Sequence, residues 1–428
     1  MKYLIQNGEV INPIGKEGKL DILLEDGRIS AMGEGLPADG AQVVDAAGKL
    51  VFPGLIDMHC HLRDPGQEYK EGLESGTKSA AMGGFTQVAC MPNTDPVIDS
   101  EAIVKELIDR ANDLGYAKVH PIATVTKGMK GKEITEFGFL TEAGAVAFSD
   151  DGLPVGDAMV MKNALTYALN FDSLIIGHEE EMRLSAGGVM NEGVVSTMLG
   201  LPGITRAAEE SMIARDIALA EATGGKVHIA HVSTDLGVAL IRFAKERGVR
   251  ITAETCPHYF CLTEEAILGF DTNAKINPPL RTEKDRQAVI QGLVDGTLDA
   301  IVTDHAPHHI DDKDVEFENA ANGMSGFETA LSLTQMYLVE PGHLGWGDVV
   351  RRTSLYPARI LKLIGGELAE GLPADVVVYD PTYTWMVTAE RLYTKGKNTP
   401  LLGKKMQGRV YAGFCNGKPT VEDYEVKA

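Results

Sequence analysis

The residues best suited to chemistry are His59 and His61, which stand one residue apart where the apolar segment 51–59 ends. Side chains of an extended segment alternate between its two faces, so both imidazoles point the same way, and Cys60 is expected in the core behind them. Neutral imidazole is the most common metal ligand among the side chains. The His-x-His pattern at a strand end therefore indicates a divalent-metal site.

Three further groups able to bind metal stand where other short apolar segments end. They are His178, His231 and Asp304. Four imidazoles together with carboxylate oxygens are more ligands than one tetrahedral ion with an open position uses. They suit two ions about 3.5–4 Å apart that share a bridging carboxylate and a bridging water. We therefore expect a binuclear metal centre.

Asp151 is the expected bridging carboxylate. In the segment AVAFSDD (145–151) it shares parity with the small residue Ser149, whereas Asp150 points the other way and is expected to cap the following turn. A carbamylated lysine is the alternative kind of bridge, but the nearest lysine, Lys162, lies in a helix-like stretch. The carboxylate itself is therefore the predicted bridge.

These residues need a scaffold that brings several strand ends together. Between residues 49 and 365 the chain has eight short apolar segments, most of them followed by a stretch with helical spacing of apolar residues that ends at glycine. The segments are 51–59, 85–91, 117–125, 145–149, 173–178, 226–232, 249–256 and 299–304, and the clearest helical stretches are 101–115, 210–225 and 234–248. This pattern predicts an α/β protein with a TIM-like (β/α)8 barrel, whose active site lies at the carboxyl ends of its strands.

The two ends of the chain have a different texture. Short β-branched and apolar runs alternate there with Gly, Asn-Pro and Asp-Gly turns, which is typical of hairpin-rich β structure. We expect the first fifty residues and the last sixty to lie outside the barrel.

Composition limits the function classes. The chain of 428 residues has 40 basic and 61 acidic residues, a net charge of −21, so binding to nucleic acid or to an anionic membrane is not expected. An anionic substrate would need locally placed cations. The five cysteines are scattered without a CxxC pair, and we find neither a signal peptide nor a run of about 20 apolar residues. A soluble, cytoplasmic protein is expected.

Seven motifs in order carry a resemblance to a known family. FPGLIDMHCHLRDPG, CMPNTDP, FSDDG, IAHVST, AETCPHYF, NPPLRTEKDR and VTDHAPH resemble the class I bacterial dihydroorotases of the amidohydrolase superfamily, over essentially the whole chain. The resemblance implies a small split β-sandwich from both termini, residues 1–52 and 366–428, around a barrel of residues 53–365. It also implies reversible cyclisation of N-carbamoyl-L-aspartate to L-dihydroorotate plus water, the third step of de novo pyrimidine (UMP) synthesis.

The same resemblance implies a role for each candidate residue. Two Zn²⁺ per subunit would be held, one by His59, His61 and Asp304 and the other by His178 and His231, with Asp151 bridging and Asp304 as the catalytic acid and base. Substrate contacts are implied for His61, Arg63, Asn93, Asn277, His308, Asn322 and Gly323. In the last stretch the chain departs from the family, because Ala321-Asn322-Gly323 replaces the usual Pro-Phe-Gly. A homodimer and an association with a transcarbamoylase are further family expectations.

Two alternative functions stay open at this point. Another cyclic amidase, such as a hydantoinase, dihydropyrimidinase or allantoinase, would share the barrel and the metals but has no use for Arg63 and Asn93. A non-catalytic scaffold relative would have lost ligands, and this chain keeps all of them. Of the remaining histidines, His120, His228, His305, His309 and His343 are expected in structural or surface positions, and His258 stays open between the core and support of the metal site. The acidic clusters Glu179–Glu181 and Asp311–Asp314 are expected to be solvated faces, with support of His178 by Glu180 or Glu181 as the alternative.

Overall fold

The computed structural model describes residues 1–427 and contains an eight-stranded parallel barrel. Each of the eight apolar segments contributes one barrel strand, in the order of the sequence: β8 (Leu55–Cys60), β9 (Phe85–Cys90), β10 (Lys118–Ala123), β11 (Ala147–Phe148), β12 (Leu174–Gly177), β15 (Lys226–Ile229), β16 (Ile251–Thr255) and β17 (Ala300–Ile301). The first segment is divided, because residues 51–53 belong to a strand of another sheet. A single parallel bridge between Cys60 and His305 joins the first strand to the chain beyond the last, so the ring is nearly closed. The predicted barrel is confirmed.

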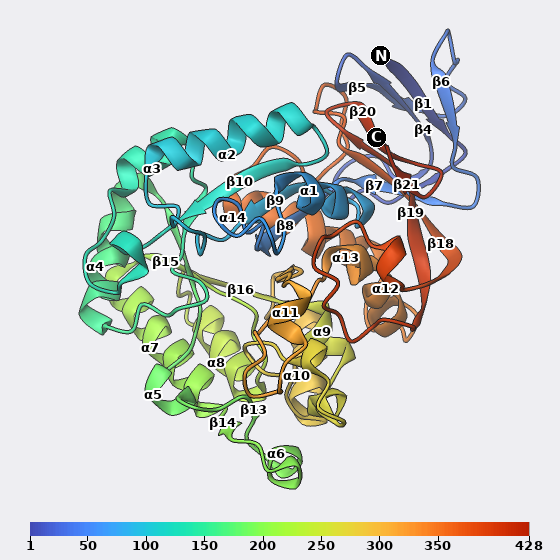
Figure 1. Cartoon of the computed structure of the whole chain (residues 1–428). Helices are drawn as coiled ribbons and strands as arrows, with labels where there is room; N and C mark the ends of the chain where they lie inside the picture. Colours follow the sequence, from blue (N-terminus) through green and yellow to red (C-terminus); the bar gives the residue numbers. More distant parts are fainter. Residues whose placement is uncertain (428) are drawn as a thin grey trace.

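Helices follow the strands on the outside of the barrel (Figure 1). They are α1 (Leu73–Met82), α2 (Glu101–Leu114), α3 (Phe137–Ala143), α4 (Ala158–Ala168), α5 (Met182–Ser185), α6 (Val194–Leu199), α7 (Ala207–Thr223), α8 (Asp235–Glu246), α9 (Pro257–Cys261), α10 (Glu283–Val294), α11 (Ile310–Lys313), α12 (Ala330–Thr334), α13 (Trp346–Val350) and α14 (Tyr356–Leu361). The short strands β13 (Met190–Asn191) and β14 (Gly203–Ile204) pair beside α6, away from the barrel.

The three helices expected from sequence are present, with small shifts at their ends. α2 ends where Gly115 takes a left-handed conformation, and α7 ends the same way at Gly224. α8 begins after Thr234, whose side chain accepts a hydrogen bond from the amide of Gly237. α7 starts three residues earlier than predicted, because the two alanines before Glu209 continue the helix.

Strands from both ends of the chain build two further sheets. The first has the order β21-β20-β19-β18-β7-β2-β3 and the second β5-β4-β1-β6. Their bounds are β1 (Lys2–Gln6), β2 (Glu9–Val10), β3 (Gly18–Lys19), β4 (Asp21–Glu25), β5 (Arg28–Gly33), β6 (Gln42–Asp45), β7 (Leu50–Pro53), β18 (Val376–Met386), β19 (Lys405–Cys415), β20 (Lys418–Glu422) and β21 (Glu425–Val426). Figure 1 shows the N-terminal and C-terminal strands side by side, where β7 pairs with β18.

A separate core lies with these terminal strands. Tyr3 and Ile22 from the first fifty residues are buried together with Val376 and Phe414 from the end of the chain. The class of fold, a barrel with terminal β strands, is therefore as predicted, while the division at residues 52 and 366 stays a prediction. Within residues 1–427 no helix is long and apolar enough to span a membrane.

Candidate active site

The strand ends bring the first three predicted ligands into contact. His59 is the fifth residue of β8, His61 follows that strand directly, and Asp304 follows β17, which is next to it around the ring. Asp304 Oδ1 lies 3.2 Å from His61 Nε2 and 3.6 Å from His59 Nε2. All three side chains are buried.

Asp151 lies between this group and the remaining two histidines. Its Oδ2 is 3.5 Å from Nε2 of both His59 and His61. Its Oδ1 is 3.3 Å from His178 Nδ1 and 3.4 Å from His231 Nε2. Each oxygen of one carboxylate thus faces a different histidine pair, which is the arrangement that a bridging ligand requires.

The spacing of these atoms fits divalent cations. Ligands on a tetrahedral ion with bonds of about 2.1 Å stand about 3.4 Å from one another. The nitrogen–oxygen distances around Asp151 and Asp304 are 3.2 to 3.6 Å. His59 Nε2 and Asp151 Oδ1 are buried and find no hydrogen-bond partner among residues 1–427. Buried polar atoms without partners are rare, so the residues present suit two metal ions with Asp151 between them.

The electrostatics of the cluster point the same way. Burial by itself lowers the pKa of His59, but the carboxylates of Asp151 and Asp304 outweigh it and raise that pKa well above its usual range. Burial likewise opposes protonation of His178, whereas Asp151 and Glu180 raise its pKa to about 10. The histidines in turn hold the pKa of Asp151 well below its usual range. The carboxylates therefore stabilise positive charge at this site, which bound cations can supply in place of protons.

Glu254 is a residue of this site that sequence reasoning missed. Its Oε1 lies 2.7 Å from His59 Nδ1 and its Oε2 lies 3.0 Å from His228 Nε2, with all three side chains fully buried. A carboxylate behind a ligating imidazole fixes the orientation and the tautomer of that ring. The signal was available, because a glutamate inside an apolar strand segment is a buried charge that must have a partner. His228 is buried as expected, but in this network.

The expectation of a solvated face at Glu179–Glu181 is wrong, because Glu179 is buried and Glu180 supports His178. Glu180 Oε2 lies 3.0 Å from His178 Nε2 and accepts a hydrogen bond of 2.9 Å from the amide of Asn277. Despite burial, His178 lowers the pKa of Glu180 to about 2, so this carboxylate is ionised. Glu181 instead caps α5 by accepting from the amide of Arg183.

The predicted substrate residues line one cavity of about 180 Å³ together with most of the predicted metal ligands. Its walls include His61, Arg63, Asn93, Asp151, His178, His231, Asn277, Asp304, His308, Asn322 and Gly323. Of the predicted site residues, His59 alone lies behind this wall, among the described residues. Asn93 Oδ1 also lies 2.8 Å from His61 Nδ1, so Asn93 orients a predicted ligand besides facing the cavity.

Arg63 supplies a buried positive charge at the cavity. Its Nε donates to the carbonyl of Pro307 at 3.2 Å, and its Nη2 lies 3.3 Å from His308 Nε2. Burial lowers the pKa of Arg63 to about 10, which leaves the guanidinium charged at neutral pH. Burial and the neighbouring Arg63 lower the pKa of His308 to about 2, so His308 is neutral and its Nε2 can donate to the carbonyl of Asn322 at 2.8 Å.

The backbone is strained at three of these positions. Arg63, His231 and Asp304 have φ values of 62°, 35° and 43°, which residues other than glycine rarely adopt. Each stands at or just beyond a strand end, where the chain must turn while its side chain stays aimed at the cavity. Such strain is typical of sites that the surrounding structure holds in place.

The loop with Ala321-Asn322-Gly323 reaches the cavity despite its unusual sequence. Gly323 has a φ of 138°, and a Cβ there would stand 2.7 Å from the carbonyl oxygen of Ala306. The glycine is therefore required for the close approach of this loop to the chain after β17.

One sequence prediction in this region is wrong. Asp150 does not cap the turn that follows it, because its Oδ1 accepts from the backbone amides of Val125 at 2.9 Å and Thr126 at 3.0 Å. The neighbouring strand β10 ends at Ala123, so these two amides lie beyond its ladder and need another acceptor.

The remaining histidines are placed largely as expected. His305 is buried and stacks on Phe327, and His309 caps α11. His258 is buried behind the site, where burial lowers its pKa to about 4. Its ring also has a nitrogen within 4.8 Å of ligand atoms of Cys256 and Asp304, so His258 lies in the core and next to a predicted metal ligand.

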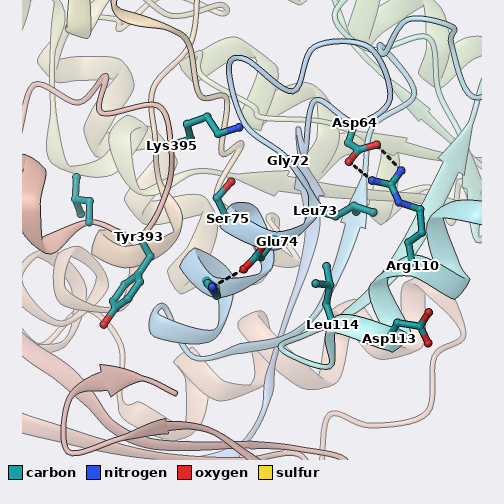
Figure 2. A pocket seen from close by; sticks show the side chains of 12 residues that line it. Asp64, Gly72, Leu73, Glu74, Ser75, Arg110, Asp113, Leu114, Tyr393 and Lys395 are labelled. Carbon is teal, nitrogen blue, oxygen red and sulfur yellow. Dashed lines mark hydrogen bonds and ion pairs between the residues drawn. The ribbon is translucent and has the colours of Figure 1, made fainter. Parts of the chain in front are cut away.

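A second hollow, of about 800 Å³, lies outside the barrel between α1, α2 and residues 392–395 (Figure 2). Arg110 donates to both oxygens of Asp64 there, each at 2.8 Å. Lys78 pairs with Glu74, and Lys395 donates to the carbonyl of Glu68. With its cations paired and no predicted site residue in its wall, this hollow is not the candidate site.

The chain is similar to known proteins over nearly its whole length. A family model described as Dihydro-orotase-like matches residues 48–236. A Dihydroorotase of Acetivibrio thermocellus is 53% identical over 421 residues, covering 98% of this chain and 99% of that protein. A Dihydroorotase of Ruminiclostridium cellulolyticum is 54% identical with the same coverage. The solved L-hydantoinase (dihydropyrimidinase) of Arthrobacter aurescens covers 100% of this chain and 97% of its own, at a TM-score of 0.88 and 24% identity, a likeness of fold alone. With relatives of that name more than half identical over their full length, the chain belongs to the dihydroorotase family.

Proposed function

We propose that this enzyme interconverts N-carbamoyl-L-aspartate and L-dihydroorotate plus water, the third step of pyrimidine synthesis. The observation that carries the proposal is the buried guanidinium of Arg63 in the same small cavity as the predicted metal ligands around Asp151. A cyclic amide with a carboxylate beside its ring would satisfy both at once. In a chain of net charge −21, this local cation is what makes an anionic substrate acceptable.

The substrate carboxylate binds to Arg63, with Asn93 and His308 as neutral partners. A guanidinium and a carboxylate form paired, charge-assisted hydrogen bonds, which fix orientation as well as affinity. Asn277 and the backbone at Asn322 and Gly323 hold the ring from the other walls of the cavity.

His59, His61 and Asp304 would hold one Zn²⁺ and His178 and His231 would hold the other, with Asp151 available to both groups. Such a centre would supply a water molecule whose pKa is lowered towards neutrality and a polarised scissile carbonyl. Asp304 takes the proton of the attacking water at a carboxylate oxygen and delivers it to the leaving ring nitrogen, and it reverses these roles in ring closure. Asp304 can do so because it both contacts His61 and lines the cavity.

The proposal includes a cytoplasmic location, a homodimer and a possible association with a transcarbamoylase. The decisive test is ring opening followed by absorbance, with dihydroorotate compared with dihydrouracil and allantoin. Turnover of dihydroorotate at least about tenfold above the uncharged amides is expected from a contact of about 1.5–3 kcal/mol to the carboxylate. Preference for an uncharged amide would favour a hydantoinase-like function. A protein that binds no metal after anaerobic purification would favour the scaffold.

A further inference from the structure

We propose that Asn398 is a positioning residue of the active site, which holds His308 and Gly323 where the substrate carboxylate and ring bind. The inference rests on the function proposed above and adds a residue from the connection between β18 and β19, far from the barrel strands in sequence. The observation behind it is that one buried side-chain amide is hydrogen-bonded to both ends of the loop that lines the cavity.

The amide of Asn398 uses one acceptor and two donors at this loop. Its Oδ1 accepts from the backbone amide of His308 at 2.8 Å. Its Nδ2 donates to the carbonyls of Ala306 at 3.1 Å and Gly323 at 3.0 Å. The residue is 4% exposed, so water has little access to replace these bonds. One planar group thus ties the chain just after Asp304 to the chain that carries Asn322.

The backbone on either side of Asn398 also packs against the loop that carries His308. The carbonyl of Asn398 accepts from the amide of Ser325 at 2.9 Å. A Cβ at Gly396 would stand 2.7 Å from the backbone nitrogen of His308 and 2.7 Å from Pro307 Cβ. Segment 394–398 therefore lies directly against the residues that present His308 to the cavity.

Segment 394–398 is itself anchored to the barrel by Glu71. This fully buried carboxylate accepts from the amide of Lys395 at 3.1 Å and from the hydroxyls of Thr394 and Ser75, and its Oε2 lies 3.3 Å from His305 Nε2. Figure 2 shows Lys395 on the segment that passes beside Ser75 and the start of α1. Asn398 thus projects from a fixed support, which is what a positioning role requires.

Removing the amide would leave three backbone groups without partners and free the loop to shift. Because His308 is bonded to the carbonyl of Asn322 and also contacts Arg63, a shift of this loop displaces several substrate contacts together. Within residues 1–427, none of the five histidine and aspartate side chains around Asp151 shares a hydrogen bond with these three backbone groups, so the metal centre should be unaffected. The expected loss lies in KM more than in kcat.

The test compares Asn398→Ala with Asn12→Ala in the metal-loaded enzyme. Asn12 is a matched control, since it is a buried asparagine whose amide also bridges backbone, donating to the carbonyl of Leu368 at 2.8 Å and accepting from its amide at 3.0 Å in the terminal sheets. We expect Asn398→Ala to raise KM for dihydroorotate about ten- to a hundredfold with kcat within about threefold. Metal content should equal that of wild type, and Asn12→Ala should leave KM unchanged.

Two further variants keep the test decisive. Asn398→Asp retains the acceptor for His308 but sets a carboxylate oxygen against two carbonyls, so it should also raise KM. Gly396→Ala places a Cβ 2.7 Å from the backbone nitrogen of His308 and 2.9 Å from Asn398 Oδ1, so it pushes the two partners apart while Asn398 stays present. This variant decides the question if Asn398→Ala does not fold. A KM within twofold of wild type in the folded variants, with melting temperature lowered as in Asn12→Ala, would show that Asn398 is merely structural. An inactive wild type with full metal content would instead overturn the proposed function.

Discussion

Replacing Glu254 by glutamine should weaken metal binding while the shape of the site is preserved. Glutamine has nearly the same volume, and its carbonyl can still accept from His59 Nδ1, now at 2.7 Å from Glu254 Oε1. What is lost is the negative charge behind the ligating ring. Both side chains are fully buried, so solvent does not screen the loss.

The magnitude follows from the kind of contact. Carboxylates behind ligating histidines change metal affinity by about 10- to 100-fold when they are altered, which is about 1.4–2.7 kcal/mol. Because Glu254 also pairs with His228 Nε2 at 3.0 Å, part of the charge effect is shared with a second ring. We therefore expect a rise of about tenfold or more in the dissociation constant of the ion that His59 would hold.

The assay is titration of metal-free protein with Zn²⁺ against a chelator of known affinity, followed by kcat of the fully loaded variant. The kcat should lie within about threefold of wild type, since Glu254 does not line the cavity. Asp285→Asn is the matched control, because Asp285 is also buried but accepts from the amide of Asp235 at 3.0 Å in a helix cap. A dissociation constant for Glu254→Gln no different from that of this control would refute the reasoning.

Four further outcomes are expected. Asp304→Asn should fold and lose at least about a hundredfold in kcat; near-normal turnover of a fully metallated variant would remove its proton-transfer role. Arg63→Met should lower kcat/KM for dihydroorotate about ten- to a hundredfold with unchanged metal content, whereas equal losses on uncharged amides would make Arg63 structural. Ring opening creates a second carboxylate and releases a proton, so the equilibrium ratio of opened to closed compound should rise about tenfold per pH unit near neutrality; a ratio independent of pH from 6 to 8 would contradict the reaction. With Asp151 as the bridge, activity after metal reconstitution should not depend on bicarbonate, and a requirement for it would indicate a carbamylated lysine.

Much of the site could be predicted because, in a parallel barrel, a residue's place at the end of a strand determines which face of the barrel it lies on. The carboxyl ends of its strands meet at one face, so His59, His178, His231 and Asp304 could be grouped once each was seen to end an apolar segment. Strand parity then chose Asp151 over Asp150, and the structure places Asp151 among the four histidines.

The network around these residues could not be predicted in the same way. Asp150 bonds amides 24 and 25 residues away, and Glu254 reaches an imidazole 195 residues away. The alternation of side chains along the strand predicts only that Asp150 points away from the barrel axis. Its hydrogen-bond partners depend on where the adjacent strand β10 stops pairing. The anchor of the 321–323 loop at Asn398 likewise lies in a segment whose sequence shows no strand-end pattern.

By itself, then, the sequence determined which strands form, which ends carry ligands and which side chains face the axis, because these follow from local periodicity and from the regular geometry of a barrel. Only the tertiary structure decided which buried carboxylate supports which imidazole, how Gly323 approaches Ala306, and that the connection between the terminal strands β18 and β19 holds the active-site loop. These contacts join residues far apart in the chain, and buried polar groups choose their partners by the space and the unpaired atoms that packing leaves, which no local pattern encodes.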